Sequence, residues 1–292
     1  MVLTERHPAV LFAYFTAIPL VMMFSSNPIF PMTALLGGFL LSILLRRNEK
    51  MYRSVLFYLG VFLLVTITNP LFSHEGETVL FFFLGVSFTW EALLYGASLS
   101  CVMIGVLIWC RCYTVVMTSE RFLYLFGSVV PKTALVLSMT FRLIPLFLRR
   151  LQGVSHAQKT MGMYAVRGFR ARVKCAGRIF SAVIALSLDR AMDTAASMRA
   201  RGYGSGKRSP YTRFRFRVWD GLSLLLLFFL LGVIFVSGTT DVVSFSYYPR
   251  ITALPHTPSA IFTYAAFAVL SFAPFFMEIR EVIRWKFYRS KI

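Results

Sequence analysis

Residues Trp219 to Val236 read WDGLSLLLLFFLLGVIFV, and this stretch decides the class of fold. Its one ionisable residue is Asp220, at the very start. A helix needs about 20 consecutive apolar residues to cross the hydrocarbon core of a bilayer. The stretch therefore predicts a transmembrane helix that starts near Trp219 and leaves Asp220 at the polar interface.

Five further apolar runs of similar length lie elsewhere in the chain, and the composition agrees with them. Of 292 residues, 57% are hydrophobic and only 15% are charged, whereas soluble domains carry about a quarter charged residues. No small-residue cleavage site follows the first run, so we expect a retained helix and not a signal peptide. The six predicted spans are Pro8–Phe24, Ile29–Leu45, Val55–Phe72, Ala92–Met117, Trp219–Val236 and Pro258–Phe276.

The segment Val79–Trp90 is apolar but only about twelve residues long, too short to span a bilayer alone. From the sequence, it either extends the fourth predicted helix or lies in the outer membrane interface. The loop that contains its start carries acidic residues and no Lys or Arg, which predicts an outer location.

The Lys/Arg bias of the other loops predicts the orientation of the whole chain. Residues 46–53 hold four basic residues against one acid, and residues 278–292 hold five against two. These basic segments alternate with acidic or nearly neutral loops, so we expect both termini in the cytoplasm.

Residues 118–217 differ from the otherwise hydrophobic chain in being strongly basic. They contain nineteen Lys/Arg against three acids, and so carry sixteen of the chain's nineteen net positive charges. By the positive-inside rule this segment is cytoplasmic. We therefore divide the chain into residues 1–117 with four transmembrane helices, 118–218 with a cytoplasmic element, and 219–292 with two more helices and a basic tail.

The basic segment is not a disordered tail, because apolar residues recur in it at helical spacing. Lys132–Arg150 and Arg178–Gly202 both predict long amphipathic helices along the inner membrane face. In the second, the apolar stripe consists of Ile184, Leu188, Met192, Ala195 and Met198. We expect Gly153, Gly162, Gly168 and Gly177 to break the intervening chain into shorter pieces.

The second amphipathic helix ends in SMRARGYGSGKR (residues 197–208), which is rich in both basic and small residues. A helix end alone explains part of this, because Gly202 suits a C-cap and arginines suit the negative end of the helix dipole. Small residues beside Arg201 also suit docking of the helix tip into a groove on another protein, where an arginine fork pairs with a carboxylate. Attraction to anionic lipids fits the same charge.

Catalytic and nucleotide-binding motifs are missing from the sequence. A phosphate-binding loop would need glycine at position 201 and Ser or Thr at 208, where the chain has Arg201 and Arg208. The four histidines are scattered, and Cys101, Cys110, Cys112 and Cys175 have no metal-ligand spacing. We expect packing cysteines without a disulfide, no metal site, and no nucleic-acid partner.

Two rival functions remain open from the residues alone. A membrane prenyl- or phospho-transferase would use Asp189 and Asp193 to hold a metal, but such sites need more carboxylates than this chain offers. A stand-alone carrier would keep charged groups in the middle of the membrane, whereas Arg111 and Asp220 lie near helix ends, where Arg111 can snorkel.

Three stretches resemble the transmembrane T component of energy-coupling factor (ECF) transporters, the ABC-type importers of vitamins and transition metals in prokaryotes. The first is NPLFSHEGETVLFFF with TWEALLYG (residues 69–83 and 89–96). The second is TSERFLYLFG with LSMTFRLIPLF (118–127 and 137–147), and the third is DRAMDTAASMRARGYG (189–204). The resemblance implies that the amphipathic helices are coupling helices and that the chain is a non-catalytic subunit.

In this family two coupling helices each end in an arginine-centred motif that docks on one of two cytoplasmic ABC ATPases. The resemblance assigns this role to Ala200, Arg201 and Gly202, with Arg199 beside them. It assigns the first motif to SHAQKTMGMY (155–164), where Ala157, Gln158 and Gly162 match but Met161 replaces the central arginine. Lys159 and Arg167 are alternative cations for that first contact.

The resemblance also implies the partners. A small membrane subunit binds the substrate, and the ATPases hold ATP and Mg²⁺, so no cofactor is expected in this chain. The expected location is the prokaryotic cell membrane, next to anionic lipids. Neither the residues nor the resemblance identifies which vitamin or metal is imported.

Overall fold

A computed structural model describes residues 6–45, 51–73, 76–83, 86–127, 130–162, 168–203, 205, 214, 216–240 and 242–289. The chain divides into two compact units. The first, which we call the membrane unit, comprises Met1–Ser119 and Phe214–Ile292. The second, the basic unit, comprises Glu120–Arg213. Each of the six predicted spans corresponds to a helix, and the expected all-α membrane fold is confirmed.

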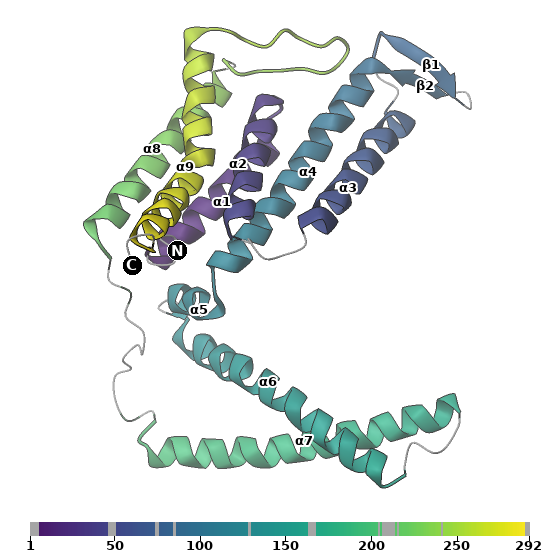
Figure 1. The fold of residues 1–292 in the computed structure, drawn as a ribbon, viewed down its shortest axis with the longest axis vertical. Coiled ribbons are helices and arrows are strands. Elements are labelled where there is room, and N and C mark those ends of the chain that lie inside the picture. The colour runs from purple at the N-terminus through teal and green to yellow at the C-terminus, as the bar shows by residue number, and fades with distance from the viewer. Residues whose placement is uncertain are drawn as a thin grey trace. The chain divides into compact units, whose positions relative to one another are not determined.

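The helices of the membrane unit are α1 (Pro8–Phe24), α2 (Ile29–Leu45), α3 (Met51–Phe72), α4 (Trp90–Val116), α8 (Val218–Thr239) and α9 (Pro258–Arg289) (Figure 1). Among the described residues, α3, α4, α8 and α9 are long and apolar enough to cross a membrane. Helices α1 and α2 are apolar but have 17 residues each. The count of six spans therefore stays a prediction for these two shorter helices.

Helix α2 packs closely on two neighbours because it carries adjacent glycines. A Cβ on Gly37 would lie 2.3 Å from the Ser271 hydroxyl of α9, and one on Gly38 would lie 2.8 Å from the Trp109 indole nitrogen of α4. The same indole N–H donates to the carbonyl of Ala34 at 2.9 Å. The buried core extends on both sides of these contacts, and its largest fully buried residues include Trp109, Phe267, Ile18, Met22 and Leu41.

The structure of the segment before α4 rules out one of the two alternatives that the sequence left open. Strands β1 (Val79–Phe83) and β2 (Val86–Thr89) form an antiparallel pair, so the segment does not extend the helix. The reason is the cap at Thr89, whose extended backbone and side-chain oxygen, accepting from the Ala92 N–H, start the helix at Trp90. A run of Val and Phe then suits strands.

Polar contacts hold the hairpin and the helix ends in place. The buried carboxylate of Glu91 accepts a hydrogen bond from the Thr78 hydroxyl at 2.7 Å. At the other end of α4, Arg111 donates to the Ser54 and Tyr58 hydroxyls of α3, at 2.8 and 3.3 Å. The Arg111 side chain is therefore hydrogen-bonded to the neighbouring helix α3. The sequence alone predicts only that it extends toward the membrane surface.

The basic unit consists of α5 (Ser119–Gly127), α6 (Pro131–Thr160) and α7 (Phe169–Ala200), with the first residue of α5 assigned to the membrane unit. Figure 1 shows α6 and α7 crossing. Two of the four predicted breaks are wrong, because Gly153 and Gly177 lie inside continuous helices. Only Gly162 and Gly168 lie outside them, with φ of +73° and +138°. None of the four cysteines, all of which lie within the described residues, is in a disulfide.

Candidate functional site

The C-terminus of α7 closes in a Schellman motif. Arg201 is the C-cap, and Gly202 adopts the left-handed conformation with φ of +77°. The N–H of Gly202 donates to the Arg199 carbonyl at 2.9 Å, and the N–H of Tyr203 donates to the Met198 carbonyl at 3.0 Å. These are the two bonds that define the motif. They hold the backbone of the helix tip in one conformation, so the direction in which Arg201 leaves the helix is set locally.

The side chains of this tip are presented to solvent. Arg199, Ala200 and Arg201 are all exposed. Neither arginine has a salt bridge to a residue that the structure describes. Cations at a helix C-terminus interact favourably with the negative dipole end, which accounts for their presence but leaves their hydrogen-bond donors available. The tip therefore exposes two cationic side chains on a backbone that is hydrogen-bonded within the helix end.

The C-terminus of α6 repeats this backbone geometry. Met161 is its C-cap, with φ of −76° and ψ of 6°, close to the −81° and 8° of Arg201. Gly162 follows with φ of +73°, and its N–H donates to the Lys159 carbonyl at 3.1 Å. Met161 therefore occupies the position of Arg201, and its side chain is 76% exposed.

The remaining residues of the first predicted motif have different surroundings. Ala157 and Lys159 are exposed, whereas Gln158 faces α7. There its amide oxygen accepts a weak hydrogen bond from the thiol of buried Cys175, at 3.6 Å. Gln158 is thus a contact between the two helices, which makes it a support for the tip instead of part of its exposed surface. Arg167 lies outside the described residues.

The two faces of α7 have different roles. One face packs on α6, where a small cluster buries Cys175, Ile179 and Val183 against Phe147, Leu151 and Val154. At about 100° per residue, the predicted stripe of Ile184, Leu188 and Met192 lies on the opposite face. Leu188 is 63% and Met192 60% exposed. The apolar stripe is therefore an uncovered surface of the basic unit.

The carboxylate pair considered for metal binding stays isolated. Asp189 and Asp193 are exposed on α7, and neither makes a salt bridge with a described residue. Within the described part of the chain, no group of three or more His, Cys, Asp or Glu side chains is placed to hold a metal ion. The geometry gives no support to a transferase site.

Sequence reasoning missed one residue of the α7 tip. Tyr203 follows Gly202 and supplies the N–H that closes the Schellman motif, while its ring is half exposed beside the arginines. The available signal was its position, because the residue after a C-terminal glycine closes this motif.

Comparisons with known proteins identify sequence relatives of this chain. The family model described as "CbiQ: Cobalt transport protein" matches residues 3–212. A protein of Listeria innocua named energy-coupling factor transporter transmembrane protein EcfT is 28% identical over 185 residues, which cover 59% of this chain and 70% of the relative. A Staphylococcus aureus protein of the same name is 25% identical over 187 residues, covering 60% and 70%. A third, from Macrococcus caseolyticus, is 32% identical over 100 residues, covering 34% and 38%.

Proposed function

This chain belongs to the cobalt transport protein (CbiQ) family and is a T component of an ECF transporter, and we propose that it is the energy-coupling subunit of an ATP-driven importer. In this proposal two cytoplasmic ABC ATPases bind the basic unit and hydrolyse ATP. A separate small membrane subunit binds a vitamin or a metal ion and carries it inward. The chain itself is non-catalytic, and ATP and Mg²⁺ are held by the ATPases.

The observation that carries the proposal is the pair of matching helix tips in the basic unit. Helices α6 and α7 end with the same cap geometry, each with an exposed side chain at the cap and a left-handed glycine after it. Two equivalent tips provide two docking points, one for each of two ATPases. The small residues Ala200 and Gly202 on either side of Arg201 allow the helix tip to approach a groove of a partner closely.

The chemistry of docking follows from Arg201. A guanidinium presents its donors in a planar fork that matches a carboxylate, and such pairs are stronger than neutral hydrogen bonds. The Schellman motif fixes the backbone before binding, so little entropy is lost on docking. At the α6 tip, Met161 offers an apolar contact in the equivalent position, with Lys159 two residues earlier. The two docking contacts therefore differ in kind.

The uncovered stripe of α7 suits the second partner. A small membrane subunit is apolar on its outside, and Leu188 and Met192 expose apolar surface beside Ile184. Methionine side chains adapt to several partner surfaces. When ATP binding closes the ATPase pair, the tips move, and the stripe passes that motion to the substrate-binding subunit. Both termini lie in the cytoplasm in this arrangement.

The first test is charge reversal at the α7 tip. We expect Arg201→Glu to lower retention of the ATPases during mild-detergent purification at least about ten-fold, and to abolish uptake, because a carboxylate would face the partner's anionic group. Arg190→Glu is the matched control: it makes the same change on the exposed surface of the same helix, eleven residues earlier. Unchanged ATPase retention and uptake in Arg201→Glu would refute the docking role.

A second variant separates the two proposed surfaces. Leu188→Arg places a charge on the stripe, so we expect it to release the substrate-binding subunit while the ATPases stay bound. Loss of both partners at once would indicate that the stripe and the tip are not separate surfaces.

A further inference from the structure

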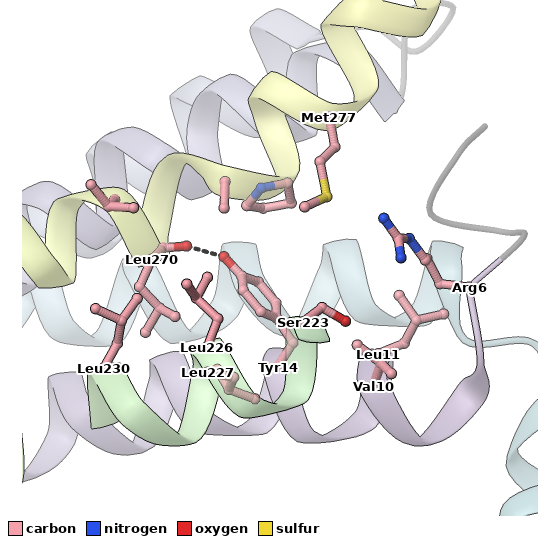
Figure 2. A pocket seen from close by; sticks show the side chains of 13 residues that line it. Arg6, Val10, Leu11, Tyr14, Ser223, Leu226, Leu227, Leu230, Leu270 and Met277 are labelled. Carbon is pink, nitrogen blue, oxygen red and sulfur yellow. Dashed lines mark hydrogen bonds between the residues drawn. The ribbon is translucent and has the colours of Figure 1, made fainter. Parts of the chain in front are cut away.

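A cleft opens in the membrane unit between α1, α8 and α9, as Figure 2 shows. Its enclosed volume is about 70 Å³, below the range of about 300–1,000 Å³ of sites that enclose a whole ligand, so only part of a ligand fits inside. Its walls are aliphatic, with Val10 and Leu11 from α1, Leu226 and Leu230 from α8, and Val269 from α9. This narrow, partly open cleft suits a segment of an apolar chain.

The polar groups inside the cleft are already hydrogen-bonded. The Tyr14 hydroxyl donates to the Leu270 carbonyl, which is free because Pro274, four residues later, has no N–H to bond it. The Ser223 hydroxyl donates to the Asp220 carbonyl at 2.8 Å. The part of an occupant that enters the cleft therefore has no polar partner to gain there and is apolar.

The mouth of the cleft is charged. Arg6 and Met277 line both the cleft and a second, more open pocket, so the two are adjacent. The Nη1 atom of Arg6 lies 3.4 Å from Oδ1 of the buried Asp220 carboxylate. This ion pair balances the positive charge of Arg6. The second pocket adds Arg280 and Arg284, neither of which has a salt bridge to a described residue.

A carboxylate stands between these arginines along α9. The Oε2 atom of Glu281 is buried and has no hydrogen-bond partner among the residues that the structure describes. A buried carboxylate oxygen without a donor is costly, so it indicates a missing donor. Trp285 and Tyr288 complete the mouth, and such aromatic residues lie at the level of lipid headgroups.

We propose that this cleft binds one phospholipid whose headgroup carries an ammonium, of the phosphatidylethanolamine class. An acyl chain occupies the aliphatic slot, the phosphate pairs with Arg280 and Arg284, and the ammonium donates to Glu281. The alternation of cation and carboxylate on α9 matches the phosphate and the ammonium of one zwitterionic headgroup. The headgroup of phosphatidylglycerol offers Glu281 only neutral hydroxyl donors, without the opposite charge of an ammonium, and free phosphate would leave the slot empty.

The test is the retention of lipid by the full-length chain. The chain is purified in mild detergent with its accompanying subunits and exchanged into nanodiscs that contain equal amounts of phosphatidylethanolamine and phosphatidylglycerol. Lipids that remain bound are counted by native mass spectrometry. We expect one phosphatidylethanolamine per chain, preferred about ten-fold over phosphatidylglycerol, as a charged hydrogen bond implies.

Variants test which residues bind the headgroup of the lipid and which bind its acyl chain. Glu281→Gln should remove the preference for phosphatidylethanolamine, and Arg280→Gln with Arg284→Gln should reduce retention of both lipids. The charge-matched control is Arg178→Gln with Arg190→Gln, which removes two exposed arginines of α7. Ala273→Phe should fill the slot and expel the lipid, whereas Gly232→Phe adds the same ring at an open position of α8.

Each result decides the proposal. Lipid bound in no fixed number, or phosphatidylglycerol retained as well as phosphatidylethanolamine, would overturn it. The same holds if Glu281→Gln keeps the preference, or if Gly232→Phe expels lipid as strongly as Ala273→Phe.

Discussion

At the scale of single residues, Gly177 inside α7 and Gly202 just after its end have different backbone conformations. Gly202 adopts φ of +77°, a conformation that costs an L-residue about 1 kcal/mol or more. Gly177 lies within the helix, and a Cβ there would meet no atom within 4 Å. The same substitution should therefore have opposite effects at the two sites.

We predict that Gly202→Ala speeds hydrogen exchange in the last turn of α7, because strain of about 1 kcal/mol opposes the Schellman motif. Gly177→Ala should instead slow exchange in the middle of the helix, because alanine favours helix by about 0.8–1 kcal/mol over glycine. The measurement is peptide-resolved exchange on both variants. Equal exchange in the last turn of Gly202→Ala and the parent chain would mean that the motif does not hold the tip.

At the scale of elements, the tips of α6 and α7 share one cap geometry but carry different side chains. An arginine at position 161 would leave the helix at the same backbone position as Arg201 does in α7. The exposed side chain of Met161 leaves room for this change.

We predict that Met161→Arg strengthens binding of an ATPase to the α6 tip, because it adds a charge-assisted fork where methionine offers only apolar contact. The dissociation rate of the ATPases from the immobilised complex should fall several-fold, as expected for about 1 kcal/mol. Thr160→Arg is the control, since it adds the same charge one residue earlier. A faster dissociation in Met161→Arg would show that the partner surface is apolar or cationic at this point.

The sequence predicted helices well and their surfaces only in part. Apolar runs and the spacing of Ile184, Leu188 and Met192 located the helices, because hydropathy and period determine them. The hairpin at Val79–Thr89 was not predicted as strands, since a short apolar run has no period that separates strand from helix. Likewise, Gly153 and Gly177 were expected to end helices that in fact continue through them.

The candidate site was predicted from its residues but not from its geometry. Arg201 and Gly202 carry a local signal, because a glycine after a basic helix end predicts a left-handed cap. The resemblance placed Met161 in the position of the central arginine, but the cap geometry that it shares with Arg201 depends on φ and ψ, which the residue types do not reveal. The inward position of Gln158 depends on how α7 crosses α6, a long-range contact that has no local signal.

At the scale of the whole molecule, the described hydrophobic cores of the two units differ greatly in size. The described core of the membrane unit includes Trp109, Phe267 and Leu41 and continues through several helices. The described core of the basic unit is the small cluster around Val183. Since local stability depends on buried apolar contacts, the basic unit should open more readily, and partners should supply what its own core lacks.

We therefore predict that amides of α6 and α7 exchange faster than those of α2 and α4 in the isolated chain, even where both are helical. Binding of the ATPases and of the substrate-binding subunit should slow exchange at the two tips and along the stripe of α7. The helices of the membrane unit should change little, apart from surfaces that the partners cover. Peptide-resolved exchange on the chain alone and on the assembled complex measures this, with Arg201→Glu as the control for protection that requires docking. If α6 and α7 were as protected alone as in the complex, the basic unit would be stable by itself, and its thin core would not explain why a coupling subunit needs its partners.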